Sequence, residues 1–298
     1  MSRTQRRNLW LGLAFVSPWI VGFVLFLAFP MVQSLWYSFT DKNVMGAGGW
    51  VGLENYRELL LRDKLFRISL YNTLYITLLG VPLSLGLSLV LALMLNLKVR
   101  GISFYRTAFY IPSIVPAVAA SMLWMWVLNP RYGLINDLLW RIGIKGPLWL
   151  GSPPWAKPAL IIMSLWGVGN TMLIYLSSLQ DVPSQLYEAA ELDGAGVWSK
   201  FRHVTLPMIT PVTLFNLIMG IINSFQYFTQ AFIVSQGKGG PANSTLFYTL
   251  YLYQKAFRDL QMGYAAAMGW ILFLIILSLT LLIVRFSKSW VYYEGGER

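Results

Sequence analysis

Long apolar runs dominate the chain, and shorter polar segments separate them. Six runs are long enough to cross a hydrocarbon core of about 30 Å, which takes about 20 residues of helix. The predicted spans are Leu9–Met31, Leu70–Leu97, Tyr105–Leu128, Ala159–Leu179, Met208–Ser235 and Gly263–Val284. The pattern therefore predicts an all-α, multi-pass membrane protein in which residues 1–298 form one transmembrane domain.

The first apolar run also has features of a signal peptide, since Arg3, Arg6 and Arg7 precede it. Its apolar stretch exceeds the roughly 7–15 residues of a signal-peptide core, and no A-x-A-like cleavage site ends it. We therefore expect a retained transmembrane helix.

One polar segment stands out between the fourth and fifth runs. We refer to residues 181–207 as the bracket. Polar side chains recur there every three or four residues, which predicts a short amphipathic helix. Pro183 and Asp193-Gly194 supply its start and stop, and a second short helix is expected over Val197–Val204. The next apolar helix should begin at Pro207. The bracket is therefore predicted to be a helix-turn-helix outside the membrane, shaped for a protein partner.

Composition agrees with a membrane protein. Charged residues make up 12% of the chain, against roughly 25% in soluble domains. The net charge of +11 is spread over helix ends and is not gathered with aromatics into one basic face, so we expect a lipid bilayer and no nucleic acid as partner. With no cysteine and a single histidine, His203, the sequence predicts neither disulfides nor a metal site.

The basic residues predict that both termini lie in the cytoplasm. In that orientation the inner segments are short and carry their positive charges close to the helix ends, where the positive-inside rule is read. The outer loops hold about as many basic residues but are much longer. The inner residues are Arg3, Arg6, Arg7, Lys98, Arg100, Arg106, Lys200, Arg202, Arg285, Lys288 and Arg298. The bracket is then cytoplasmic.

The spans lack the residues that conduct ions or protons. Residues 70–97, 159–180 and 208–235 contain no acidic, basic or histidine side chain. Intramembrane charges usually mark ion and proton pathways, so a proton-coupled carrier or a charge-lined channel is disfavoured.

In place of charged residues, the spans contain uncharged hydrogen-bonding groups and aromatic rings. They are Ser113, Trp124, Ser164, Trp166, Asn170, Thr171, Asn216, Asn223, Phe225, Gln226, Tyr227 and Gln230. Such groups suit a neutral polyhydroxylated ligand, whose hydroxyls need partners and whose apolar face stacks on rings. The alternative is that each residue only joins helices, at about 0.6 kcal/mol on average.

The four polar residues around position 226 are more informative together. Asn223, Gln226, Tyr227 and Gln230 recur at three- and four-residue spacing, which predicts one polar helix face that is directed toward a cavity or partner helices.

Pro112 and Pro116 predict kinks in the third span. No G-x-x-x-x-G-K-[ST] phosphate loop occurs, so the chain is not expected to be an enzyme that hydrolyses ATP.

The bracket also resembles a known motif. Glu188-Ala189-Ala190, Asp193-Gly194-Ala195, Phe201 and Leu206-Pro207 are similar to the EAA loop of binding-protein-dependent ABC importer permeases of the carbohydrate-uptake group, which includes the maltose and glycerol-3-phosphate importers. Further similarities are Tyr105-Arg106 with Pro112 and Pro116, Asn129-Pro130 with Gly133 and Asn136, and Gly239-Gly240-Pro241 with Thr245. The last resembles the inner-membrane subunit of the maltose transporter that carries the sugar site.

This resemblance implies a type I ABC importer permease fold. It implies a sister permease as heterodimer partner, two ATP-binding subunits and an extracytoplasmic sugar-binding protein, in the inner membrane of a prokaryote. ATP and magnesium would bind to the partner ATPases, with no cofactor on this chain. Glu188, Ala189, Ala190, Asp193, Gly194, Ala195, Phe201, Leu206 and Pro207 would couple to the ATPase. By position, the sugar contacts of the family fall on or near Ser113, Ser164, Gly167, Val168, Thr171, Phe225 and Gln226.

The expected function is import of a neutral sugar or oligosaccharide by alternating access. The expected ligand contacts are Ser113, Ser164, Trp166, Gly167, Asn170, Thr171, Asn223, Phe225, Gln226, Tyr227 and Gln230. The alternatives are a permease for a polyol or glycerol phosphate, a secondary sugar carrier that needs no ATPase, and a structural membrane scaffold. The lack of a buried cation argues against a phosphate.

Overall fold

A computed structural model describes residues 2–43, 46, 48–97 and 99–292. Lys98 and Arg298, which enter the charge argument, lie outside the described residues, as do the two ends of the predicted 1–298 domain. The chain divides into two compact units, Met1–Asp63 with Leu252–Phe273 and Lys64–Tyr251 with Leu274–Arg298. The described residues are mostly helical and hold no β-strand beyond an isolated bridge between Thr40 and Trp50.

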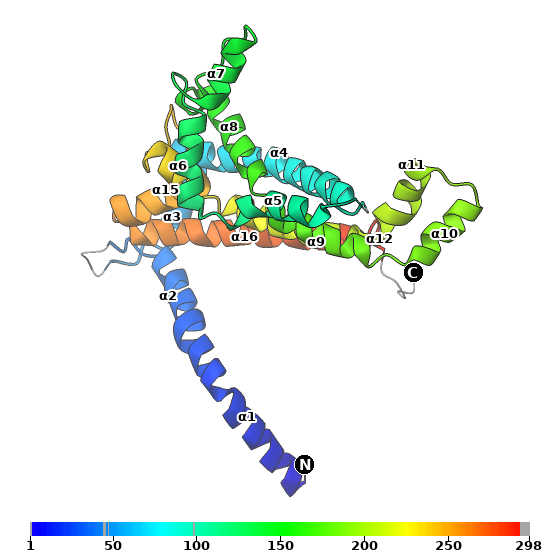
Figure 1. The fold of residues 1–298 in the computed structure, drawn as a ribbon. Helices are drawn as coiled ribbons and strands as arrows, with labels where there is room; N and C mark the ends of the chain where they lie inside the picture. Colours follow the sequence, from blue (N-terminus) through cyan, green and yellow to red (C-terminus); the bar gives the residue numbers. More distant parts are fainter. Residues whose placement is uncertain (1, 44–45, 47, 98, 293–298) are drawn as a thin grey trace. The chain divides into compact units, whose positions relative to one another are not determined.

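The first unit begins with a long, continuous helical segment, which is blue in Figure 1. It consists of α1 (Arg3–Phe23), the π-helical turn η1 (Val24–Ala28) and α2 (Phe29–Ser38). The segment is 36 residues long, and its most apolar window has no buried residue. A helix that is apolar all round and unburied needs lipid or another protein around it.

Polar contacts order the rest of the first unit. It holds α3 (Glu54–Arg57), the π-helical turns η2 (Glu58–Arg62) and η5 (Gln254–Arg258), and the start of α16 (Met262–Ser287). The Asn55 amide donates to the carbonyls of Ser38 and Thr40, at 2.9 Å each. The Tyr264 hydroxyl donates to the Asp63 carboxylate at 2.6 Å. These bonds join segments that are far apart in the sequence.

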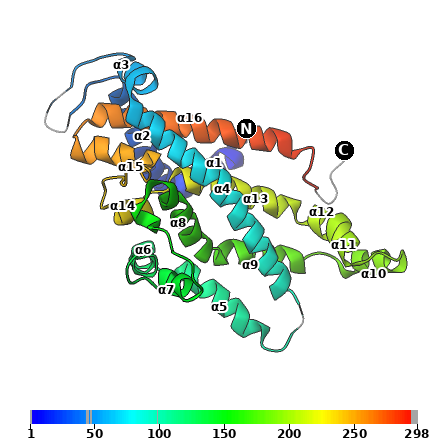
Figure 2. The ribbon, with the colours of Figure 1, turned by 90° about the horizontal axis from the view of Figure 1, so that it is seen from above.

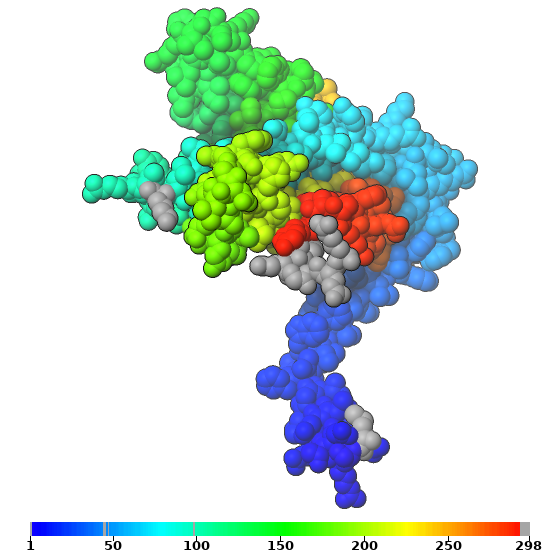
Figure 3. All heavy atoms as spheres, turned by 90° about the vertical axis from the view of Figure 1, so that its right-hand side faces the viewer, coloured from blue at the N-terminus to red at the C-terminus, as the bar shows by residue number. Residues whose placement is uncertain are grey.

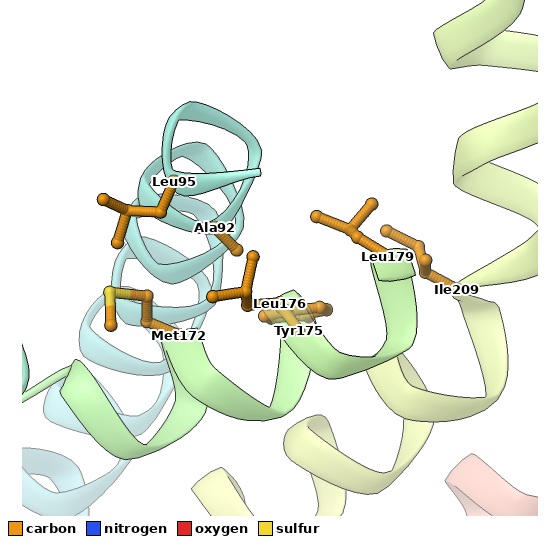
Figure 4. Close-up of a cluster of buried hydrophobic side chains, with 7 residues drawn as sticks. All are labelled: Ala92, Leu95, Met172, Tyr175, Leu176, Leu179 and Ile209. Atoms are coloured by element: carbon orange, nitrogen blue, oxygen red, sulfur yellow. The ribbon is translucent and has the colours of Figure 1, made fainter. Parts of the chain in front are cut away.

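The second unit is built around α4 (Lys64–Leu95). This helix packs against α8 (Pro153–Trp166), α9 (Gly169–Gln180) and α13 (Thr210–Phe225), as Figure 2 shows. One end of α4 meets α9 in a buried apolar cluster (Figure 4), which consists of Ala92, Leu95, Met172, Tyr175, Leu176, Leu179 and Ile209. Lipid tails are as apolar as these side chains, so close van der Waals packing, and not removal from water, joins α4 and α9 here.

The predicted number of spans agrees with the helices, but not every predicted span is one continuous helix. Four described segments are long and apolar enough to cross a membrane: Arg3–Ser38, Lys64–Leu95, Thr210–Ser235 and Met262–Ser287. The third and fourth predicted spans are each a pair of bent helices, which gives six spans if each pair counts once. The all-α fold class is confirmed.

The predicted span Tyr105–Leu128 is two helices. α5 (Ile102–Ile114) and α6 (Ala117–Val127) meet at an angle of 99°. Proline disfavours helical backbone in the residue before it, and Val115 is accordingly extended, with φ −68° and ψ 128°. The kink predicted at Pro116 is thus present, whereas Pro112 lies inside α5 without interrupting it.

The fourth and fifth predicted spans are also interrupted. α8 and α9 bend by 49° at Gly167 and Val168. α13 ends at Phe225, and α14 (Thr229–Ser235) begins only after three further residues. The prediction that Asn223 to Gln230 share one continuous helix face is therefore wrong, because no helical periodicity crosses this break. Hydrogen bonds from other elements hold the end of α13, and periodicity along the chain does not reveal them.

The two arms of the bracket form as predicted, but the next apolar helix, α13, begins at Thr210 and not at Pro207. α10 (Ser184–Leu192) follows Pro183, and the left-handed Gly194 (φ +77°) turns the chain. The return arm consists of α11 (Val197–Lys200), the π-helical turn η4 (Phe201–Thr205) and α12 (Leu206–Met208). In Figure 1 the two arms project beyond the ends of α4 and α9.

The second unit also contains the part of α16 from Leu274 onward and three short elements. α7 (Leu134–Arg141) and the 3₁₀ turn η3 (Trp149–Gly151) lie in the connection between α6 and α8. α15 (Tyr248–Tyr253) follows the loop after α14 and leads into the first unit.

Candidate functional site

A cleft of about 470 Å³ opens among the broken helices of the second unit. We call it the central cleft. α4, α5, α6, α8, α9, α13 and α14 all contribute to its walls, and the lining residues gather at the three interruptions. Helix interruptions expose side chains and backbone groups that a continuous helix would keep to itself, so these breaks are where a ligand finds polar partners.

Most of the predicted ligand contacts line this cleft. They are Ser113, Ser164, Trp166, Gly167, Thr171, Asn223, Gln226, Tyr227 and Gln230, and Val168 joins them. Two predicted residues do not line it. Asn170 is exposed elsewhere on α9, and Phe225 is fully buried at the end of α13. Neither side chain lines the central cleft, so a ligand contact of Asn170 or Phe225 stays a prediction without support from the cleft.

The described residues that line the central cleft include no charged side chain. Lys157 of α8 is not among them, because its ammonium donates to the Asn72 amide oxygen at 2.9 Å and lies over the rings of Tyr71 and Tyr75. A charged ligand in this cleft would lose its hydration without a counter-charge, which is costly. The lining therefore suits an uncharged, polar ligand.

The hydroxyls and the amides of the cleft differ in what they offer. Ser84, Ser113 and Ser164 each donate to a carbonyl three residues earlier in their own helix, at 2.9, 2.7 and 2.7 Å. They are left with acceptor capacity only. The amides of Asn223, Gln226 and Gln230 make no side-chain hydrogen bond within the described residues, so each offers both donors and an acceptor.

Aromatic rings add flat apolar surface. Trp166 stands edge-on to Trp124, with ring centroids 6.2 Å apart, and Tyr227 stands edge-on to Phe247 at 5.3 Å. The Tyr227 hydroxyl is buried and has no hydrogen-bond partner in the described part of the chain. Rings fixed in this way by neighbours are pre-oriented for stacking.

Sequence reasoning missed the contribution of α4 and the small residues of α13. Ile76, Gly80, Val81 and Ser84 line the cleft from α4, and Gly220, Ser224 and Thr229 line it from α13 and the start of α14. Gly80, Ser84 and Ser88 recur every four residues. In membranes, such spacing of small residues marks close helix packing. It was the one feature of the sequence that pointed to this part of the cleft lining.

Internal bonds stiffen the bracket. Lys200 pairs with Glu191 at 2.6 Å across the turn, and the hydroxyls of Tyr187 and Thr205 lie 3.0 Å apart between the two arms. Glu188 is exposed and makes no ion pair within the described residues. A charge held on a stiff arm and left unpaired is available to another chain.

The bracket also exposes large apolar side chains at its tip. Leu192, Val197 and Trp198 are 91%, 83% and 73% exposed. The bracket, yellow-green in Figure 3, is seen there from the side toward which it projects. Clustered exposed apolar residues mark interaction surfaces, and Leu192 follows Glu188 by one turn of α10.

A second hollow, of about 580 Å³, lies in the connection between α6 and α8. The Asn136 amide lines this hollow, but its hydrogen bonds are made within the connection itself. It donates to the carbonyls of Pro130 and Pro147 at 3.1 Å each, and its oxygen accepts from Trp149. The described residues also contain no group of acidic, histidine or cysteine side chains arranged for a metal.

Comparison with known proteins identifies the family. Residues 80–291 match the family described as binding-protein-dependent transport system inner membrane component. The chain is 43% identical over 298 residues to the probable ABC transporter permease protein YesP of Bacillus subtilis (strain 168), covering 99% of this chain and 96% of YesP. It is 37% identical to the lactose transport system permease protein LacF of Rhizobium radiobacter, covering 91% and 92%.

A solved structure has the same fold. A chain of a bacterial ABC transporter involved in the import of the acidic polysaccharide alginate superimposes with a TM-score of 0.84 at 24% identity, covering 96% of this chain and 98% of that one. The permease fold implied by the EAA-like bracket is thus confirmed. The chain belongs to the family of inner membrane components of binding-protein-dependent transport systems.

Proposed function

We propose that this permease imports a neutral sugar or oligosaccharide through the central cleft. The observation that carries the proposal is the cleft lining, in which unpaired amides and fixed aromatic rings occur without a charged side chain. Relatives named for lactose and for arabinooligosaccharides, the latter 31% identical, support this class of ligand.

Glycerol phosphate is the weaker candidate. A relative from Pectobacterium atrosepticum, 32% identical, is named for sn-glycerol-3-phosphate. A desolvated phosphate is held best by charge-assisted hydrogen bonds from a cation, and the described lining of the cleft includes no charged side chain. Lys157, the cation of α8, is held by Asn72 and two tyrosine rings outside the cleft lining.

The bracket would be the site at which the ATP-binding partner subunits drive the movement of this chain. In this proposal two partner subunits bind ATP and Mg²⁺, a sister permease completes the pathway, and an external binding protein delivers the sugar. Both termini and the bracket would face the cytoplasm of a prokaryote, inside its inner membrane. Glu188 would pair with a basic group of the ATPase, and Leu192, Val197 and Trp198 would enter an apolar groove. The match of residues 188–207 to the EAA motif supports this assignment.

The geometry suggests how movement would reach the cleft. The Glu191–Lys200 pair and the Tyr187–Thr205 contact make the two arms move together. The return arm leads through α12 into α13, whose far end bears Asn223 and the break at Gln226. Rigid rotation of the bracket would therefore alternate the side to which the cleft opens.

Uptake by the reconstituted complex tests the proposal. The complex is placed in sealed proteoliposomes with its binding protein, and the probes are lactose, an arabinooligosaccharide mixture and glycerol-3-phosphate. We expect ATP-dependent uptake of at least one neutral saccharide and none of glycerol-3-phosphate. Uptake that continues without ATP would instead support a secondary carrier, and preference for glycerol-3-phosphate would reject the neutral-ligand proposal.

Charge reversal in the bracket tests the coupling role. Glu188→Lys should abolish co-purification of the ATP-binding subunits and ATP-driven uptake, because it places a cation against a basic partner group. Glu58→Lys, an equal charge change at another exposed position, is the control and should retain the ATPase. Normal ATPase assembly in Glu188→Lys would remove Glu188 from the coupling site.

A further inference from the structure

Three buried polar side chains near the start of α4 bond to other parts of the second unit. Asn72, Thr73 and Thr77 are 1%, 1% and 6% exposed, and we call them the α4 polar row. Buried hydroxyls in membrane helices usually bond only to their own helix. The α4 polar row also bonds to the loop after α14, to α15 and to α13.

Asn72 uses its whole amide. Its nitrogen donates to the carbonyls of Asn243 and Leu246, at 2.8 and 3.0 Å, and its oxygen accepts from the Lys157 ammonium at 2.9 Å. An ammonium group only donates hydrogen bonds, so Lys157 fixes which end of the amide faces the loop. Asn72 thereby holds two backbone groups of the loop between α14 and α15.

Thr73 and Thr77 extend the contacts along α4. The Thr73 hydroxyl accepts from the backbone N–H of Tyr248 at 2.9 Å, which satisfies the first N–H of α15. The Thr77 hydroxyl donates to the Thr73 carbonyl and lies 2.8 Å from the hydroxyl of Ser224. Because the one Thr77 proton is used within α4, Ser224 is the donor to Thr77.

These contacts converge on the break between α13 and α14. Ser224 and Phe225 are the last residues of α13, and the Phe225 carbonyl accepts from the Thr249 hydroxyl at 3.1 Å. The break places Gln226 and Tyr227 in the central cleft. The α4 polar row therefore holds this wall of the cleft directly, through Ser224, and indirectly, through the loop and α15.

The interruption between α5 and α6 has no such anchor among the described residues. In α5 and α6, the hydroxyls of Ser113 and Ser121 donate to carbonyls of their own helices. Arg106, at the far end of α5 from the bend, donates to the Leu95 carbonyl of α4. The two walls of the cleft thus differ in how they are held.

We propose that Asn72, Thr73 and Thr77 are positioning residues for the central cleft. They fix the α13–α14 break on α4, so that Gln226 and its neighbours keep their arrangement relative to α4 when α13 moves. The bond between Thr77 and Ser224 is the critical contact, and Lys157 acts by orienting Asn72. The functional meaning rests on the proposed transport role of the cleft, whereas the geometry can be tested without any sugar.

The chain has no cysteine, so a single reporter can be placed cleanly. Gln226→Cys is introduced into the permease within its complex, and its reaction with a small water-soluble methanethiosulfonate is followed on this chain by mass spectrometry. Thr77→Val and Ser224→Ala should each raise the labelling rate roughly five-fold, the change that loss of one buried hydrogen bond produces in an opening equilibrium. Thr77→Ser, which keeps the hydroxyl, should label at the parent rate.

Ser69→Ala is the matched control. Ser69 is buried on the same helix, but its hydroxyl donates only within α4, to the Phe66 carbonyl. Unchanged labelling in both Thr77→Val and Ser224→Ala would overturn the proposal, as would an equal increase in Ser69→Ala. If Thr77→Val does not fold, Ser224→Ala decides, because it removes the other end of the same bond. The readout uses neither sugar nor ATP, so failure of the transport proposal would be seen separately, in the uptake assay.

Discussion

Individual side chains in the central cleft divide by whether their hydrogen-bonding capacity is already used. The hydroxyls of Ser113 and Ser164 each donate a hydrogen bond to a carbonyl of their own helix. Asn223, Gln226 and Gln230 keep both donors and acceptor within the described structure. Sequence composition counts all five as polar, yet the amides alone can both give and accept a hydrogen bond with a sugar hydroxyl.

Gln226→Leu should weaken transport by lowering ligand affinity. Loss of one neutral hydrogen bond, about 0.5–1.5 kcal/mol, corresponds to a roughly 2- to 10-fold rise in the sugar concentration for half-maximal uptake. The measurement is uptake in proteoliposomes with the saccharide found in the probe screen. Asn170→Leu is the control, since Asn170 lies outside the cleft lining. Equal effects of the two changes would contradict the cleft assignment.

Helices of the second unit are placed by close contact as much as by apolar area. Gly169, the first residue of α9, approaches α5 so closely that an added Cβ would lie 2.9 Å from the Phe109 carbonyl oxygen and 2.9 Å from the Ser113 hydroxyl. Glycine is the residue that permits such an approach. The position of Ser113 in the cleft depends on it.

Gly169→Val should therefore push α5 and α9 apart. Overpacking of this kind costs about 1–3 kcal/mol, visible as a lower unfolding midpoint of the detergent-solubilised complex. Gly86→Val in α4 places the same side chain where nothing lies within 4 Å of the added Cβ, and it should change stability by less than about 1 kcal/mol. Comparable midpoints for the two variants would show that the α5–α9 contact has room for a side chain.

At the scale of the whole molecule, the orientation in the bilayer decides which side of the membrane the termini and the bracket face. The described structure contains up to six apolar spans, and the distribution of short-loop positive charges predicts cytoplasmic termini and a cytoplasmic bracket. This orientation decides whether Glu188 meets an ATPase or an external protein, so it is the assumption on which the coupling proposal depends.

Single cysteines test the orientation. Asp193→Cys in the bracket and Lys145→Cys in the connection between α6 and α8 are both exposed positions. In intact cells a membrane-impermeant maleimide should label Lys145→Cys at once and Asp193→Cys only after the membrane is permeabilised. The reverse pattern would place the bracket outside and rule out its contact with a cytoplasmic ATPase.

The sequence was sufficient where the information is local. The start and stop of α10 follow from Pro183 and Gly194, and the bend before α6 follows from Pro116. The apolar runs are long enough to predict the spans from the bilayer thickness. The family also follows from local residues, because the EAA-like motif is one contiguous segment, and it lies within residues 80–291, which match the family.

Only the tertiary structure decided how the polar residues are used. The polar composition of the spans placed Asn170 with the ligand contacts, and the family resemblance placed Phe225 there, but Asn170 does not line the cleft and Phe225 is buried. The three- and four-residue spacing predicted a continuous helix across Gln226, where a bond to Thr77 and a bond from Thr249 fix the end of α13. Those partners are 147 and 24 residues away in the chain, and such long-range hydrogen bonds leave no periodic trace in a sequence because they depend on which helices pack together.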